Sequence, residues 1–300
     1  MNTKIKKIDV HVHSLMYPEL SLPRPDGANF ATPEQIMAMY DDWGIEYGFI
    51  LPEITNECCC TAMTSEEACV ISKKYPERFG WFCNLSPRMG DNNDKTNFGR
   101  FLEHYKALGA KGVGEVCANL PFDDPMYDNM FYWCAEYDMP VIFHMTGHIG
   151  GDYGIYDELG LPRMEKILAK YPKLRLIGHS QAFWAEMSGD ITEEKRGMYP
   201  TGKVTEGRLH YLLRKYPNLY CDMSAGSGSN AFTRDDDNAF RFIEEFSDRL
   251  MYGTDICSPK NHFALGGWLE ENHDKGNISD ENYYKICRGN AIKQLKLDMN

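Results

Sequence analysis

The sequence has no long apolar run. No stretch of 18 consecutive apolar residues occurs, and Lys4, Lys6 and Lys7 lead directly into a candidate strand without an apolar signal core. A membrane-spanning helix needs about 20 such residues, and a secretory signal needs a shorter apolar core. We therefore expect a soluble cytoplasmic protein with no membrane partner.

Positive charge is also scarce. The chain has 32 Lys and Arg residues against 44 Asp and Glu residues, which gives a net charge of −12. Nucleic acids and anionic membranes attract basic surfaces, so neither is expected as the main partner. A local basic pocket can still bind an anionic small molecule, and we expect a small-molecule substrate.

Paired cysteine motifs are missing as well. The ten cysteines are scattered along candidate strands and helices, which favours reduced thiols over a disulfide scaffold. The run Cys58-Cys59-Cys60 lacks the C-x-x-C spacing of a zinc site, and adjacent side chains of one segment cannot all face one ion. We interpret this run as a loop of small, semi-buried residues.

No low-complexity tract or long Gly/Ser linker divides the 300 residues. A hydrophobic content of 43% with 13% aromatic residues is ample for a packed core. Because TIM barrels commonly run to about 250 residues or more as one domain, we expect a single domain over residues 1–300.

Short apolar runs, rich in β-branched and aromatic residues, recur along the chain with helix-like sequence between them. Near-continuous apolarity is expected of parallel strands that are buried on both faces. The eight runs are residues 8–13, 47–52, 79–85, 112–116, 140–144, 174–179, 219–223 and 250–255.

The segments between the runs carry helix signals. Residues 33–40 follow Thr32 as an expected N-cap and begin with a proline. In residues 65–76 we expect Ser65 as the N-cap, with acidic residues in the first turn, lysines in the last turn and a proline stop. The same Lys-Tyr-Pro ending occurs at residues 170–172 and 215–217, each followed by a candidate strand. This alternation predicts an α/β fold, a (β/α)₈ TIM barrel.

Metal-capable side chains lie at or next to the C-terminal ends of these runs, which converge on one face of a parallel barrel. His11 and His13 are two residues apart in a strand, so they point to the same side and can chelate one ion. Alone, this pair is equally compatible with two ordinary histidines. The matching residues on other strands favour a metal site with a position open for water. The full set is His11, His13, Glu115, His144, His179 and Asp255.

The motif Asp9-Val10-His11-Val12-His13, together with His144, His179 and Asp255, resembles the amidohydrolase superfamily. The similarity is greatest to the amidohydrolase-related branch and spans nearly the whole chain. It is carried by Val141-Ile142-Phe143-His144, Leu176-Ile177-Gly178-His179, Tyr252-Gly253-Thr254-Asp255 and the C-terminal Arg288-Gly289-Asn290-Ala291.

The resemblance implies a divalent metal, usually zinc, as one or two ions. It implies that His11, His13 and His144 bind metal, and that Asp255 is a further ligand and the catalytic proton carrier. His179 resembles the strand-six histidine. That residue either binds a second metal or hydrogen-bonds the attacking water or the substrate carbonyl, so His179 is also expected to be catalytic.

Glu115 is compatible with two versions of the site. A carboxylate on the fourth strand either bridges two metals or, beside a single metal, holds a basic residue or the substrate. Some superfamily members carry a carboxylated lysine on this strand. Lys111 lies four residues before Glu115, nearer the bottom of the strand, so we do not expect a carbamate bridge.

Two residues are expected to bind substrate. The guanidinium of Arg88, after the third run, can pair with a substrate carboxylate, although an exposed loop arginine is the alternative. His148 lies in a Gly-rich loop after the fifth run, and such a loop can approach a ligand closely.

We favour a metal-dependent hydrolase that acts on a C–O or C–N bond of a small carboxylated lactone, ester or cyclic amide. The main alternative is non-oxidative decarboxylation of a small aromatic or unsaturated carboxylic acid, because the resembled branch includes such lyases. Glu115 argues mildly against decarboxylation, because a bridging carboxylate favours activation of water for hydrolysis. A hydratase and a non-catalytic metal-binding barrel are further alternatives. The resemblance also implies a homodimer, for which the sequence shows no self-complementary patch.

Overall fold

The computed structural model describes residues 5–24, 27–57 and 62–299. The run Cys58-Cys59-Cys60 lies outside these residues. No helix in the described ranges is long and apolar enough to cross a membrane.

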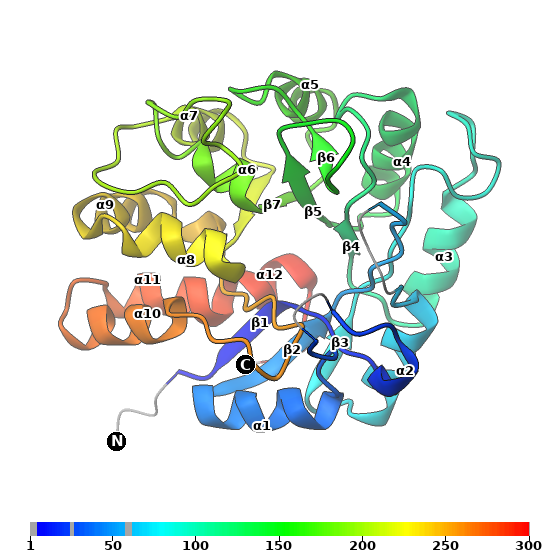
Figure 1. Ribbon diagram of the computed structural model, residues 1–300, viewed down its shortest axis with the longest axis horizontal. Coiled ribbons are helices and arrows are strands. Elements are labelled where there is room, and N and C mark those ends of the chain that lie inside the picture. The colour runs from blue at the N-terminus through cyan, green and yellow to red at the C-terminus, as the bar shows by residue number, and fades with distance from the viewer. Residues whose placement is uncertain (1–4, 25–26, 58–61, 300) are drawn as a thin grey trace.

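Parallel strands form the centre of the molecule, with helices around them (Figure 1). A strand begins within or next to each of the eight predicted runs. A further short strand, β6 (Ile155–Tyr156), pairs with β5. The eight strands are β1 (Lys7–Val12), β2 (Ile45–Ile50), β3 (Phe79–Trp81), β4 (Val113–Val116), β5 (Val141–Thr146), β7 (Leu176–His179), β8 (Leu219–Asp222) and β9 (Leu250–Met251).

Hydrogen bonds connect these strands at the two places where regular pairing stops. Strands β1–β3 form one sheet, and β4, β5, β7, β8 and β9 form another. Cys83, just after β3, bridges to Val113 of β4, and Ile256, after β9, bridges to Val12 of β1. All of these pairings are parallel, and the predicted (β/α)₈ barrel is confirmed.

Helices follow most of the strands, as the sequence pattern predicts, and short 3-10 or π turns lie at residues 18–20, 247–249 and 285–289. The helices are α1 (Pro33–Trp43), α2 (Ser65–Lys74), α3 (Gly99–Ala107), α4 (Pro125–Glu136), α5 (Pro162–Lys170), α6 (Gln181–Ala185), α7 (Arg208–Lys215), α8 (Ala225–Thr233), α9 (Asp236–Phe246), α10 (Leu265–Asp274), α11 (Asp280–Tyr284) and α12 (Asn290–Leu295).

The predicted helix ends are mostly confirmed. Thr32 caps α1 in a reciprocal capping box with Gln35. Helices α2, α5 and α7 each end at the lysine of a Lys-Tyr-Pro motif, with the tyrosine as the C-cap. The N-cap of α2 was predicted wrongly. Thr64 caps this helix by accepting from the Glu67 N–H, whereas the Ser65 hydroxyl accepts from the backbone N–H of Asn84 at 2.9 Å.

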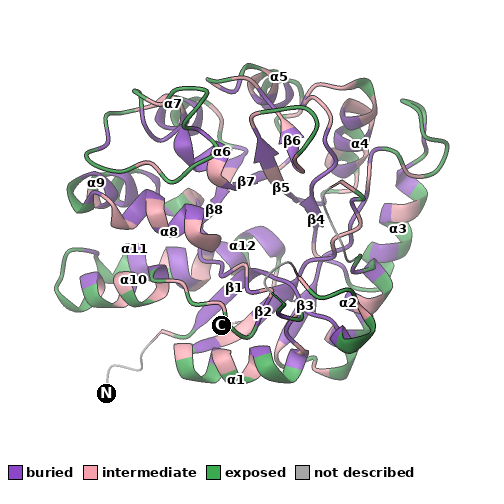
Figure 2. Ribbon diagram, in the orientation of Figure 1, coloured by how far each residue is buried: buried purple, intermediate pink, exposed green. Residues whose placement is uncertain are grey.

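The apolar interior has two parts. The larger part lies between the strands and the helices, so the outer faces of the helices remain exposed (Figure 2). The smaller part fills the barrel itself with residues such as Ile8, Val10, Phe49 and Ile177. Ala291 and Leu295 of α12 belong to this inner cluster, so the C-terminal helix packs against the residues inside the barrel.

An irregularity in β1 prepares the functional end of the barrel. Val10 lies in the inner cluster and Val12 in the outer one, and the register with β2 shifts between Asp9 and Val12. Such irregularities re-aim side chains locally. The rings of His11 and His13 come together here, with their centroids 4.9 Å apart.

Candidate metal centre

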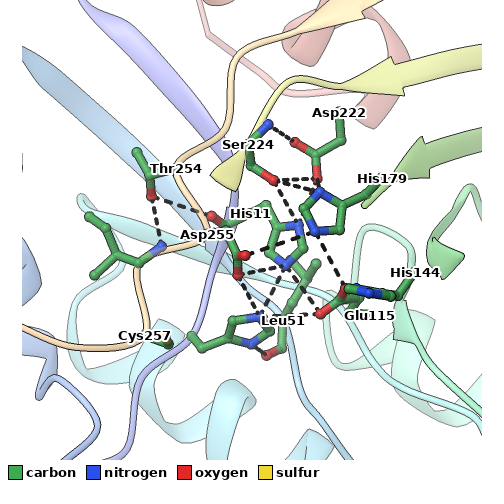
Figure 3. A network of polar contacts seen from close by, with 12 residues as sticks. His11, Leu51, Glu115, His144, His179, Asp222, Ser224, Thr254, Asp255 and Cys257 are labelled. Carbon is green, nitrogen blue, oxygen red and sulfur yellow. Dashed lines mark hydrogen bonds and ion pairs between the residues drawn. The ribbon is translucent and has the colours of Figure 1, made fainter. Parts of the chain in front are cut away.

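Side chains from several strand ends converge at the centre of the barrel (Figure 3). His11 comes from β1, and His13 directly follows this strand. Glu115 comes from β4, His144 from β5 and His179 from β7, and Asp255 follows β9. The structure therefore brings together all six predicted metal-capable side chains.

The tautomers of His11 and His13 follow from their partners. Nδ1 of His11 lies 2.6 Å from Asp222 Oδ2, and Nδ1 of His13 lies 2.9 Å from the carbonyl oxygen of Leu51. Both partners are acceptors, so each Nδ1 carries a proton. The two Nε2 atoms lie only 3.0 Å apart at the centre of the site. With each Nδ1 protonated, a metal ion at this point could be held by the Nε2 atoms of both histidines.

His179 is oriented by Ser224, which follows β8. The Ser224 hydroxyl lies 2.9 Å from Asp222 Oδ2 and 2.9 Å from His179 Nδ1. Because a carboxylate only accepts, the hydroxyl donates to Asp222 and accepts from His179 Nδ1–H. Nε2 of His179 is left as a free lone pair facing the same centre.

The carboxylate of Glu115 lies between two pairs of imidazoles. Its Oε2 is 3.4 Å from Nε2 of both His11 and His13. Its Oε1 is 2.9 Å from Nδ1 of His144 and 3.7 Å from Nε2 of His179. Each oxygen thus faces its own pair, which is the arrangement that a bridging ligand requires.

Asp255 completes the first group of donors. Its Oδ1 lies 3.3 Å from His13 Nε2 and 3.6 Å from His11 Nε2, and its Oδ2 lies 3.8 Å from His179 Nε2. The Asp255 side chain is 25% exposed, whereas that of Glu115 is 5% exposed. Of these two carboxylates, Asp255 is the one open to a substrate.

Unusual backbone angles occur next to these side chains. Ser180, Ala225 and Asp255 have φ values of 101°, 62° and 57°, a region that residues other than glycine seldom adopt. Each lies just beyond the end of a strand. The Asp255 conformation is held by its N–H, which donates to the His11 carbonyl at 2.7 Å. Strain of this kind commonly accompanies functional sites.

Opposite charges dominate the electrostatics. Burial acts to lower the pKa of His11, but Asp222, Glu115 and Asp255 outweigh it and raise that pKa well above the usual value. Burial likewise opposes ionisation of Glu115, yet His11 and the neighbouring histidines hold the pKa of Glu115 well below its usual value. The Glu115 carboxylate therefore remains ionised and attracts a cation.

The donor set fits a divalent metal. A tetrahedral ion with ligands at about 2.1 Å has ligand atoms roughly 3.4 Å apart. The Nε2 atoms of His11 and His13 lie 3.0 Å apart, and each is 3.3 to 3.6 Å from Glu115 Oε2 and Asp255 Oδ1. Glu115, His144 and His179 form a second group of donors, all within 4.8 Å of one another. The described residues thus contain two donor groups that share Glu115.

Sequence reasoning missed the residues behind the ligands. Asp222 binds His11 and Ser224, and Asp9 accepts hydrogen bonds from Tyr40 and Thr254. Asp222 ends an apolar run in the same way as the predicted ligands. This position is the feature of the sequence that could have pointed to Asp222. Nothing in the sequence distinguishes an aspartate that orients a metal-binding histidine from an aspartate that binds the metal itself.

The two predicted substrate-binding residues do not join the cluster. Arg88 forms an ion pair with Glu57 at 2.5 Å and also donates to the carbonyl of Asn119. The His148 side chain is 61% exposed, and its nearest charged partner is Asp152 at 3.9 Å. Lys111 lies away from the site, with its ammonium near the carbonyl of Lys296, as its position in the strand predicted.

Comparisons with known proteins identify the family of the chain. The amidohydrolase family model matches residues 8–297. No curated protein matches the chain. Among solved structures, an uncharacterised TIM-barrel protein from Bordetella bronchiseptica has a TM-score of 0.67 at 18% identity, covering 98% of this chain and 100% of that chain.

Two further solved structures differ in their chemistry. A dihydroxybenzoic acid decarboxylase from a Polaromonas species, with bound manganese and 2-nitroresorcinol, has a TM-score of 0.61 at 18% identity, covering 98% of each chain. A probable 2-pyrone-4,6-dicarboxylic acid hydrolase from Acinetobacter baumannii, with citric acid bound, has a TM-score of 0.59 at 12% identity, covering 98% of this chain and 100% of that chain. At these identities the likeness shows the shared fold.

Proposed function

The chain belongs to the amidohydrolase family, whose members are metal-dependent enzymes, and from this premise we propose that it hydrolyses a C–O or C–N bond in a small carboxylated molecule. Lactones, esters and cyclic amides are the substrate classes. The observation that carries the proposal is Glu115, whose two oxygens face two separate pairs of imidazoles. A carboxylate so placed suits a pair of metals that activates water.

We propose zinc as the metal, in one or two ions. His11, His13 and Asp255 would hold one ion, His144 and His179 a second, and Glu115 would bridge them. Imidazole nitrogens are favourable zinc donors, and carboxylates complete the set. When bound, the metal makes a water molecule acidic enough to attack near neutral pH and polarises the substrate carbonyl.

Asp255 is the proposed base. Burial alone would raise the pKa of Asp255, but His11, His13 and His179 lower it, so the carboxylate is ionised near neutral pH. Its partial exposure puts it within reach of the attacking water. Asp255 accepts the proton from that water and returns it to the leaving oxygen or nitrogen.

His179 acts as a neutral base or ligand. Burial lowers the pKa of His179 more than the nearby Asp222 raises it. Because its Nδ1 donates to Ser224, its Nε2 can bind a metal or accept a proton but cannot donate to a substrate carbonyl. Of the roles that the sequence predicts for His179, this tautomer favours metal binding.

Decarboxylation is the second candidate, because the Polaromonas enzyme of similar fold carries out that reaction on an aromatic acid. The same site can hold a substrate carboxylate. Asp255 in its protonated form would then deliver a proton to the carbon that loses CO₂. Glu115 favours hydrolysis over decarboxylation, because a carboxylate that bridges two metals helps to activate water.

Isotope incorporation separates the two reactions. Zinc-loaded protein is incubated with lactones, cyclic amides and dihydroxybenzoates in H₂¹⁸O and, separately, in D₂O. Hydrolysis places one solvent oxygen in the product, whereas decarboxylation releases CO₂ and leaves deuterium on carbon. We expect ¹⁸O incorporation, and CO₂ release with deuterated product would refute the hydrolase proposal. Lys111→Ala, far from the site, is expected to keep full turnover and serves as the control.

A further inference from the structure

Tyr153 contacts His144, one of the candidate ligands, without belonging to either donor group. It is in the Gly-rich loop that follows β5, and its ring packs against His144 with the centroids 4.5 Å apart and the planes at 39°. The loop that supplies the exposed His148 therefore returns to the site five residues later with an aromatic side chain.

The Tyr153 hydroxyl is available to a ligand. Among the described residues it has no hydrogen-bond partner, while the ring is largely covered. A phenol keeps its proton near neutral pH, so the Tyr153 hydroxyl can donate a hydrogen bond to a ligand oxygen, whereas the carboxylates of the centre can only accept.

We propose that the Tyr153 hydroxyl donates a hydrogen bond to an oxygen of the ligand bound at the metal centre, and that Tyr153 is a substrate-binding residue for carboxylate or carbonyl oxygens. This rests on the proposed function only in requiring that a ligand binds at this centre. It holds for hydrolysis and for decarboxylation alike.

The backbone at Gly154 allows Tyr153 to reach the site. Gly154 has a φ of +109°, and a Cβ atom there would lie 2.9 Å from Cδ2 of His144. Its N–H donates to the carbonyl of Cys117 at 2.7 Å, which ties the end of the loop to the chain after β4. Only glycine permits this close approach to His144.

Asn119 holds the rest of the loop. Its side-chain amide donates to the carbonyls of His148 and Gly154, each at 3.0 Å, and its Oδ1 accepts from the N–H of Gly150 at 2.7 Å. Asn119 is 7% exposed, so these three bonds are largely shielded from water. We assign Asn119 as a positioning residue that acts through Tyr153.

Arg88 is connected to Asn119 through Glu57. The backbone N–H of Asn119 donates to Glu57 at 3.3 Å, and Glu57 pairs with Arg88. Arg88 therefore supports the segment that carries Asn119. That Arg88 and His148 bind substrate stays a prediction.

Inorganic phosphate is a suitable oxyanion probe for this assignment. Its affinity for zinc-loaded protein is measured by isothermal titration calorimetry, with metal content checked in every sample. Tyr153→Phe keeps the ring against His144 and removes only the donor. Because a hydrogen bond to a charged acceptor is lost, we expect phosphate affinity to fall about 10-fold or more at unchanged zinc content.

Tyr156→Phe is the matched control. Tyr156 lies three residues further along, on β6, with its ring against the Arg163 guanidinium at 5.8 Å. We expect this variant to bind phosphate as the wild type does. Equal phosphate affinity in the wild type and Tyr153→Phe, or no phosphate binding by the zinc-loaded wild type, would overturn the assignment.

A double-mutant cycle tests Asn119. If Asn119 acts through Tyr153, then Asn119→Ala weakens phosphate binding, and adding it to Tyr153→Phe causes little further loss. Fully additive losses would contradict the positioning role. Failure of hydrolysis in the isotope experiment would leave these binding results unchanged, so the two proposals fail separately.

Discussion

His11 donates from Nδ1 to Oδ2 of Asp222 across 2.6 Å, and neither side chain is exposed to solvent. Asp222 also accepts from the Ser224 hydroxyl, which in turn accepts from His179. One buried carboxylate thus sets the orientation of two imidazoles from different strands. Partners of this kind fix the tautomer of a metal-binding histidine and increase its basicity.

Replacing Asp222 should therefore weaken metal binding without removing a ligand. We expect Asp222→Ala to lower zinc affinity about 10- to 100-fold, as is usual when the partner of a metal-binding histidine is lost. Competition with a chromophoric chelator measures the effect. The control is Asp237→Asn, which replaces a 73% exposed carboxylate and should leave the zinc affinity unchanged. Wild-type affinity in Asp222→Ala would show that His11 needs no orienting partner.

The two-sided arrangement of Glu115 predicts a change in metal stoichiometry. We expect about two zinc equivalents in protein purified without chelators and about one in Glu115→Ala, because the bridging carboxylate is gone. Elemental analysis measures both. Glu186→Gln alters another buried carboxylate, outside the two donor groups, and should retain two equivalents. One equivalent in both wild type and Glu115→Ala would indicate a mononuclear site and strengthen the case for decarboxylation.

Asn290, in the C-terminal segment that resembles the family, has a structural role. Its side-chain amide donates to the carbonyls of Ser247 and Leu250 at 2.6 and 2.7 Å, which ties α12 to the start of β9. We expect Asn290→Ala to lower the free energy of unfolding by about 2 to 4 kcal/mol, since two buried acceptors lose their donor. Urea denaturation measures this. The exposed Lys293→Ala in the same helix should change stability by less than about 0.5 kcal/mol.

Periodicity was sufficient to predict the barrel and the shared location of the ligands. Each apolar run contains or adjoins a strand, and parallel strands necessarily bring their C-terminal ends to one face. Local cap chemistry was less decisive. Thr64 and Ser65 are both good N-cap residues, and only the contact of Ser65 with Asn84, from a segment nineteen residues away, determines which of them caps the helix.

The residues around the ligands could not be predicted in the same way. The partner of Arg88 is Glu57 and the support of the Gly-rich loop is Asn119, and both depend on which loops meet at the rim. Tyr153 is one of 18 tyrosines, and the residues around it in the sequence give no sign that its ring packs on His144. Tertiary contacts between loops decide these roles.

His210 provides a pH-dependent contribution to stability that is separate from the candidate metal centre. It is buried against Phe242, with ring centroids 4.9 Å apart, and its Nδ1 accepts from the N–H of Gly207 at 3.3 Å. Burial lowers the pKa of His210 below its usual value of 6.5. The folded protein therefore takes up this proton at lower pH than the unfolded chain does.

The sign of the effect follows from that difference in proton uptake. Below about pH 6.5 the unfolded state binds more protons, so the His210 contribution is present above that pH and is lost as the pH falls. We expect the His210→Asn substitution to remove this loss of stability at low pH. The amide oxygen of Asn can still accept a hydrogen bond from the N–H of Gly207. The free energy of unfolding of His210→Asn should then decline less than that of the wild type between about pH 7 and 5, as measured by urea denaturation. The exposed His104→Asn should follow the wild-type curve. Parallel curves for wild type and His210→Asn would mean that the fold tolerates a charged imidazole beside Phe242.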